Sequence, residues 1–236
     1  MLLDVSGLCA GYGSKQVIRG VDLQVGEREV VAVLGHNGAG KSSLMHAIFG
    51  VIPATAGRIA FAGQDITNMS PSDKVVAGMG YSPQGGESFR TLSVADNLAL
   101  GGFALKDQSS IPERIRAVQE LFPPLRERRN SRAGSLSGGE RQMLALGALL
   151  IASPKLVILD EPSGGLSPMM VDKMYEAIRN VADNLGASVL LVEQEANHAL
   201  EIADRAYVLG NGKVIYEGPA QELAKSEKLG DLLLGL

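Results

Sequence analysis

The sequence has little cysteine, no strong excess of either charge and no long apolar run. Its single cysteine, Cys9, excludes an internal disulfide framework. The 22 basic and 26 acidic residues give a net charge of −4, so the overall charge gives no reason to expect nucleic acid as a partner. The longest apolar stretch, residues 143–152, is half as long as the roughly 20 residues that a transmembrane helix needs.

The N-terminus also lacks the features of a secretory leader, because residues 1–5 contain neither a basic segment nor a long apolar one. We therefore expect a soluble chain whose association with a membrane depends on a partner. No internal repeat or low-complexity segment is present, which predicts a single domain over residues 1–236. With 45% hydrophobic and 20% charged residues, the composition is typical of a globular protein with a large core.

Strand and helix patterns alternate along the chain and predict an α/β fold. The continuous apolar run at residues 30–34 predicts a strand buried on both faces of a parallel sheet. A strand is also expected at 17–25, and a short one at 57–61 beside these two. The remaining expected elements are strands at 156–159 and 189–192, helices at 42–49, 140–151 and 169–184, a mainly helical stretch at 94–130 broken at Pro123-Pro124, and a hairpin of strands 206–209 and 213–217.

A glycine-rich loop follows the strand at 30–34 and fits the pattern G-x-x-x-x-G-K-[ST], in which backbone N–H groups surround nucleotide phosphates. Lys41 is predicted to contact the β- and γ-phosphates, and Ser42 to bind Mg²⁺. His36 occupies a variable position of the loop and is expected to be solvated. The residues predicted to bind ATP are Gly35, His36, Asn37, Gly38, Ala39, Gly40, Lys41, Ser42 and Ser43.

Two acidic residues, Asp160 and Glu161, follow the apolar run at 156–159. The carboxyl ends of parallel strands form the edge at which open α/β sheets bind ligands. Asp160 is therefore a candidate ligand of Mg²⁺, and Glu161 a candidate general base for the attacking water. Such a pair on its own is equally compatible with a solvated strand end, but the phosphate-binding loop favours the catalytic interpretation.

A second anion-binding site is predicted at the start of the helix near residue 140, where Ser137, Gly138 and Gly139 offer a hydroxyl and free N–H groups. One nucleotide does not need two such sites unless the second belongs to another subunit. The run Leu136-Ser137-Gly138-Gly139-Glu140 resembles the signature of the ATP-binding cassette (ABC) ATPases, and the resemblance covers essentially the whole chain.

This resemblance implies a fold and an assembly. The fold would be a P-loop NTPase (RecA-like) core with an antiparallel β subdomain (about 1–85 and 155–236) and an inserted α-helical subdomain (about 86–154). The assembly would be a head-to-tail dimer holding two ATP molecules. In each site, residues Ser137, Gly138, Gly139 and Glu140 of one subunit would face the ATP bound to the glycine loop of the other.

Further positions match the family pattern. Tyr12 matches the aromatic residue that stacks on adenine, and Gln84 the glutamine that contacts Mg²⁺ and water and links the site to a transmembrane partner. The segment from Gln84 through Asn97 would form much of the surface that receives this partner. These assignments come from the resemblance and not from the spacing of the residues.

Two positions depart from the pattern: Ser167 stands where most cassettes carry aspartate, and Gln194 where most carry the switch histidine. Gln194 can donate an amide hydrogen bond to the γ-phosphate but cannot carry a charge. His198, one helical turn further on, is expected at the surface. Since Glu161 is present, we predict that the site hydrolyses ATP, with Glu161, Gln194 and Gln84 as its catalytic residues.

With these two departures, the sequence is similar to the second ATPase of branched-chain amino acid importers. The implied partners are transmembrane permease subunits, a second ABC ATPase or a second copy, and indirectly a solute-binding protein, at the cytoplasmic face of the cell membrane. A urea or short-amide importer of the same family is the alternative. A small-molecule kinase is disfavoured because it has no use for the signature, and a non-transport cassette because such proteins usually carry two cassettes or long coiled inserts.

Overall fold

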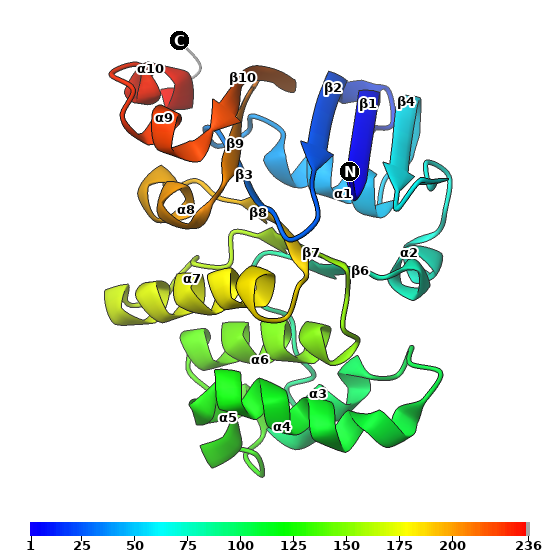
Figure 1. Cartoon of the computed structure of the whole chain (residues 1–236), viewed down its shortest axis with the longest axis vertical. Helices are drawn as coiled ribbons and strands as arrows, with labels where there is room; N and C mark the ends of the chain where they lie inside the picture. The colour runs from blue at the N-terminus through cyan, green and yellow to red at the C-terminus, as the bar shows by residue number, and fades with distance from the viewer. Residues whose placement is uncertain (235–236) are drawn as a thin grey trace.

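Two β-sheets and a group of helices make up the described residues, 1–234, of this computed structural model (Figure 1). One sheet has six strands in the order β10-β9-β3-β8-β7-β6, and the other has four in the order β2-β1-β4-β5. The strands are β1 Leu3–Tyr12, β2 Lys15–Val25, β3 Val30–Leu34, β4 Ala54–Phe61, β5 Gln64–Asp65, β6 Met79–Ser82, β7 Leu156–Asp160, β8 Ser188–Val192, β9 Arg205–Gly210 and β10 Lys213–Pro219.

The helices lie around the six-stranded sheet and in a group below it in Figure 1. They are α1 Lys41–Phe49, α2 Pro71–Ala77, α3 Val94–Gly101, α4 Ile111–Leu121, α5 Pro123–Glu127, α6 Gly138–Ile151, α7 Pro168–Asp183, α8 Ala196–Ile202, α9 Ala220–Ala224 and α10 Leu229–Leu234, with 3-10 turns η1 Gln108–Ser110 and η2 Ala133–Ser135. No helix within residues 1–234 is both long and apolar enough to cross a membrane.

The three central strands β3, β8 and β7 run parallel and are buried at every position, as the continuous apolar runs predict. Their side chains alternate between two hydrophobic clusters. Val30, Ala32 and Leu34 pack in the cluster that contains residues of α6, α7 and α8, whereas Val31 and Val33 pack with α1 and the antiparallel sheet. The sheet is therefore covered on both faces, and its carboxyl edge remains for ligands.

The strand predicted at 57–61 exists, but its predicted position is wrong. β4 pairs with β1, which lies between β4 and β2, while β3 belongs to the other sheet. The sequence did not reveal β1 because the strand changes phase. Leu3 and Val5 are buried before the register shift at Gly7 (φ 58°), and Leu8 and Ala10 after it, so the alternation of buried residues is interrupted.

Helices α3 to α6 all lie between strands β6 and β7 in the chain. The break predicted at Pro123-Pro124 occurs at Phe122 (φ −125°, ψ 77°), and Pro123 starts the next helix, where its missing N–H costs nothing. α6 begins at Gly138 rather than at Glu140, so the signature glycines form its first turn. At Gly147 a Cβ atom would lie 2.8 Å from Val118, which explains the close contact of α6 with α4.

Candidate functional site

The glycine-rich loop connects the end of β3 to α1 and surrounds the side chain of Lys41. The Nζ atom of Lys41 donates hydrogen bonds to the carbonyls of Gly35 (2.8 Å) and His36 (3.3 Å), and the side chain is 5% exposed. Burial lowers the pKa of Lys41. The N-cap residue Gly40 (φ 105°) provides no side-chain cap, so the first N–H groups of α1 remain available to an anion.

The other residues of the loop differ in the space around them and in their exposure. At Gly35 a Cβ atom would lie 2.3 Å from the carbonyl oxygen of Leu209, so only glycine fits. Asn37 and Gly38 are exposed, and Ala39 is buried. His36, expected to be solvated, is partly buried.

The predicted Mg²⁺ ligands Ser42 and Asp160 meet at the carboxyl edge of the sheet. The Ser42 hydroxyl donates a hydrogen bond to Oδ1 of Asp160 (3.2 Å), and Tyr81 donates one to Oδ2 (3.5 Å). Asp160 is 3% exposed, and burial raises its pKa. Within residues 1–234 no group of three or more histidine, cysteine or acidic side chains could hold a metal. These oxygen donors therefore fit a hard cation that takes its other ligands from phosphates and water.

Glu161 is held between three segments of the chain. Gln84 donates a hydrogen bond of 2.5 Å from Nε2 to its carboxylate, and Lys41 Nζ lies 4.0 Å away. The backbone N–H of Glu161 donates to the carbonyl of Val192 (2.9 Å). Its φ of 47° is unusual for a residue other than glycine and is stored strain of the kind found at functional sites. The structure thus brings Glu161, Gln84 and Lys41 together.

Gln194 and Glu161 line one cavity of about 340 Å³, together with the loop from Ser163 to Leu166. Gln194 is exposed. His198, predicted at the surface, has a side chain that is 37% exposed. It also lines this cavity, and its ring stacks on Tyr175 at 5.4 Å between centroids, because α8 packs against α7.

Tyr12 lies at the end of β1 and is 49% exposed. Its hydroxyl forms a 3.0 Å hydrogen bond with Nδ1 of His46, a residue of α1. The His46 ring in turn contacts Tyr81 edge to face at 6.0 Å. Tyr12 is thereby attached to the helix that starts at the glycine loop.

The signature residues form the capped start of α6. Ser137 accepts a hydrogen bond from the N–H of Glu140 (3.3 Å), and Glu140 accepts one from the N–H of Ser137 (2.8 Å), which makes a capping box. Arg128 also pairs with Glu140 at 3.0 Å. The signature and the glycine loop therefore lie at the starts of two different helices, α6 and α1.

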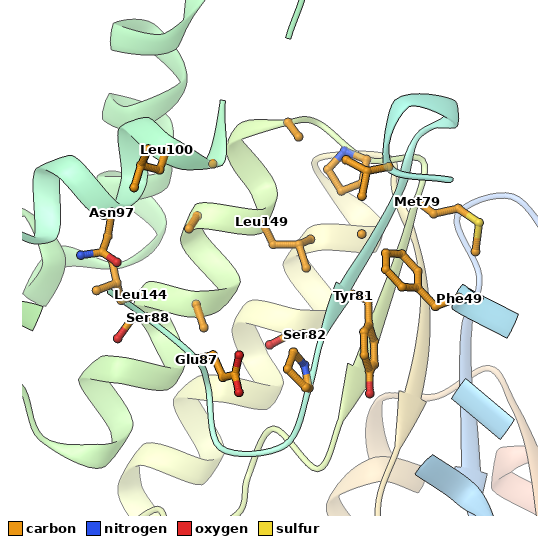
Figure 2. A pocket seen from close by; sticks show the side chains of 18 of the residues that line it. Phe49, Met79, Tyr81, Ser82, Glu87, Ser88, Asn97, Leu100, Leu144 and Leu149 are labelled. Carbon is orange, nitrogen blue, oxygen red and sulfur yellow. The ribbon is translucent and has the colours of Figure 1, made fainter. Parts of the chain in front are cut away.

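Figure 2 shows a second cavity, of about 410 Å³. Apolar side chains from α1, β6, α3 and α6 line it, namely Phe49, Met79, Tyr81, Leu100, Leu144 and Leu149. Glu87, Ser88 and Asn97 lie along its side in Figure 2. The Ser88 hydroxyl is buried and has no hydrogen-bond partner within residues 1–234. Pro83, the residue directly before Gln84, also lines this cavity.

Sequence analysis missed Glu193 and Tyr81 as members of the site. Glu193 follows the apolar strand β8 directly, in the same way that Asp160 ends β7, so its place after a buried strand was a usable signal. Tyr81 gave no such signal, because an aromatic residue within a short strand is ordinary core composition.

Comparison with known proteins agrees with these features. Residues 18–164 match the family described as ABC transporter. The chain is 41% identical over 224 residues to the high-affinity branched-chain amino acid transport ATP-binding protein BraG of Pseudomonas aeruginosa, covering 95% of each chain. It is 38% identical over 229 residues to the probable branched-chain amino acid transport ATP-binding protein LivF of Archaeoglobus fulgidus, covering 97% of each. A solved ATP-binding cassette of an ABC transporter in its ADP conformation superposes with a TM-score of 0.88 at 25% identity, covering 100% of this chain and 99% of that one.

Proposed function

We propose that this chain, which belongs to the ABC transporter family, is the ATPase subunit that drives the uptake of branched-chain, hydrophobic amino acids. The observation that carries the solute class is the similarity, over nearly the whole chain, to two relatives that are both named for branched-chain amino acid transport. The ATPase activity is supported by the family match and by the cluster of Lys41, Ser42, Asp160 and Glu161.

The glycine loop binds the phosphates of ATP through the free N–H groups of α1 and through Lys41. Ser42 and Asp160 hold Mg²⁺, with Gln84 as a further oxygen donor. Bound there, Mg²⁺ would neutralise charge on the phosphates. The Lys41 ammonium, already surrounded by loop carbonyls, reaches the β- and γ-phosphates without a large rearrangement of its side chain.

Glu161 takes a proton from the attacking water, and Gln84 orients its carboxylate through their hydrogen bond. Gln194 donates an amide hydrogen bond to the γ-phosphate from the other side of the shared cavity. Because an amide does not titrate, this contact is independent of pH near neutrality. Tyr12 stacks on the adenine ring.

Hydrolysis requires a second ABC subunit, either another ATPase or a second copy. The signature residues Ser137, Gly138, Gly139 and Glu140 face the ATP on that subunit's glycine loop. The capping box uses the N–H groups of Ser137 and Glu140, so those of Gly138 and Gly139 remain for the phosphate. ATP favours the closed dimer because only there do both phosphate sites bind it.

The transmembrane permease subunits bind at the cytoplasmic face of the cell membrane, and a segment of a permease subunit enters the cavity of about 410 Å³. Its apolar walls fit an apolar helix segment, and Ser88 and Glu87 fit a hydrogen-bond donor or a basic side chain on that segment. The segment 86–154 moves with the permease relative to the core, and Gln84 transmits this movement to Glu161. A solute-binding protein contributes indirectly, and nucleic acid is not a partner.

The test is purification of the tagged chain with its membrane partners from native membranes, followed by reconstitution into liposomes. We expect co-purification of permease subunits and a second cassette, and ATP-dependent uptake of leucine. Uptake of urea instead of leucine would favour the urea or short-amide importer. Recovery of ATPase activity without any membrane protein would contradict the transport function, as would transfer of the γ-phosphoryl group to an added acceptor.

The Glu161→Gln substitution in this complex tests the catalytic base. We expect ATP binding to be retained while hydrolysis falls by about 100-fold or more, because the amide cannot accept the proton. Glu201→Gln, at an exposed position outside the cavity that Glu161 lines, is the matched control and should leave hydrolysis unchanged. Normal turnover of the Glu161→Gln complex would contradict the assignment of the base.

A further inference from the structure

A buried carboxylate, that of Glu193, lies next to the site and has no part in the functions assigned so far. Glu193 follows β8 and is 2% exposed. Among the residues described by the structure, no lysine, arginine or histidine forms a salt bridge with it. An unpaired buried carboxylate is costly unless hydrogen bonds satisfy it, so its retention calls for a physical reason.

The carboxylate of Glu193 accepts hydrogen bonds from the loop that follows Glu161 and from the backbone of the next residue in the chain. Its Oε1 atom accepts from the N–H of Ser163 (3.2 Å), two residues beyond Glu161 in the chain. Its Oε2 atom accepts from the N–H of Gln194 (3.3 Å). One side chain therefore connects the loop that follows the candidate base to the backbone of the residue at the switch position.

The loop after Glu161 needs such support, because Glu161 itself is strained. Its φ of 47° persists only if neighbouring contacts fix the chain on both sides. On one side the N–H of Glu161 donates to Val192 (2.9 Å), and on the other the N–H of Gly164 closes a turn onto the carbonyl of Glu161 (3.1 Å). Glu193 adds the bond to Ser163, in the middle of that turn.

We propose that Glu193 is a positioning residue for ATP hydrolysis: its carboxylate fixes the loop that follows Glu161 and the backbone of Gln194 relative to each other. This inference rests on the roles of Glu161 and Gln194 given under the proposed function. Because both oxygens of Glu193 are used, neither loop can shift without losing a bond to the same carboxylate. Glu161 and Gln194 therefore move as one unit.

The surroundings of Glu193 are consistent with this role. Burial raises its pKa, and the hydrogen bonds from Ser163 and Gln194 act in the opposite direction and favour the ionised form. Tyr175 is 4% exposed, and its ring stacks on His198, a residue that lines the same cavity as Glu193. The carboxylate thus lies in a packed environment that restricts its rotamer.

The test compares Glu193→Gln and Glu193→Asp in the reconstituted complex. Glutamine keeps the shape but places an NH₂ group opposite one of the two backbone donors, so one segment loses its bond. Aspartate keeps the charge but is one methylene shorter and does not reach both N–H groups. We expect kcat to fall by about 10- to 100-fold in both variants, while the affinity of the isolated chain for ATP changes by less than about twofold.

The outcomes separate this proposal from its alternatives. Glu201→Gln is the matched control, since it neutralises an exposed carboxylate on α8, outside the cavity that Glu193 lines. Wild-type kcat in Glu193→Gln would overturn the positioning role, and wild-type kcat in Glu193→Asp would show that only the charge matters. Parallel loss of kcat, ATP affinity and Tm would instead mean a purely structural role. If Glu161→Gln is inactive and Glu193→Gln normal, only this inference fails. If Glu161→Gln itself turns over normally, the proposed base is wrong.

Discussion

Glycines and a hydroxyl residue lie at the start of both α1 and α6, yet the N–H groups of the two first turns are capped differently. The first turn of α1 has no side-chain cap and no acidic residue, so its N–H groups are open. The first turn of α6 has a complete capping box and an acidic residue, Glu140. The N-terminal end of any helix attracts anions through its dipole and its N–H groups. The two ends differ because side chains already bind some of these N–H groups at α6 and none at α1.

This difference fits the two roles proposed for the helices. An open first turn is costly in the absence of a ligand, and at α1 the buried Lys41 and its bonds to loop carbonyls fix the loop instead. At α6 the capping box satisfies some of the N–H groups of the first turn without a ligand. Only the N–H groups of Gly138 and Gly139 remain for a partner's nucleotide. In the proposed function the α1 end binds ATP in one chain, whereas the α6 end contributes only within a dimer.

The opposite ends of the two helices differ as well. The carbonyl of Ile48 in α1 accepts a hydrogen bond from Nζ of Lys74 (2.8 Å), and Lys74 is fully buried. The carbonyl of Ile151 in α6 accepts one from Nη1 of Arg114 (3.2 Å). A lysine can lose its proton at alkaline pH and an arginine does not, so only the α1 end depends on pH.

The largest expected effect follows from removal of the ammonium at the open end. Lys41→Ala should weaken ATP binding by the isolated chain about 100-fold, because two charge-assisted contacts to phosphate are lost. Its Tm should also fall, because the two hydrogen bonds from Nζ to loop carbonyls are lost with the ammonium. The measurement is titration with a fluorescent ATP analogue, with the exposed Lys173→Ala as control. Undiminished ATP binding would contradict the assignment of the loop.

A smaller effect is expected from Ser137→Ala at the capped end. Loss of the N-cap costs about 1 kcal/mol, which corresponds to a Tm lower by about 2–4 °C. ATP binding by the isolated chain should be unchanged, and hydrolysis by the complex should fall about tenfold because a phosphate contact of the partner site is lost. Weakened ATP binding by the isolated chain would mean that the starts of α1 and α6 serve one site, which would contradict their separate roles.

The smallest effect concerns the dependence of stability on pH. Burial lowers the pKa of Lys74 to about 8, whereas an unfolded chain keeps the ordinary value of 10.5. Between these two values the unfolded chain binds more protons, so the free energy of unfolding should rise with pH there, and Lys74 should add no pH dependence below about pH 8. Urea unfolding of wild type and Lys74→Met at pH 7.5, 8.5 and 9.5 measures it. The same pH slope in both proteins would contradict this shift.

Much of this molecule was predictable because its signals are local. The buried strands at 30–34 and 156–159 and the helix at 42–49 follow from continuous or periodic apolar patterns, which a short window of sequence contains. The strand Leu3–Tyr12 was missed because a bulge at Gly7 changes its phase, and the position of 57–61 was wrong because strand order is not a local property. The stacking of His198 on Tyr175 was not predicted because nothing in the sequence shows how α8 packs against α7.

The sequence by itself determined which residues are candidates for binding phosphate and magnesium, since glycines, a lysine, a hydroxyl and an acidic pair at fixed spacing define those chemical properties locally. Only the tertiary structure decided how they meet. Gln84, Glu161 and Glu193 come from distant parts of the chain and approach one another because β6, β7 and β8 are neighbours in one sheet. Contacts across such distances depend on the order in which strands pair, which is set by the packing of the whole core rather than by any segment of it.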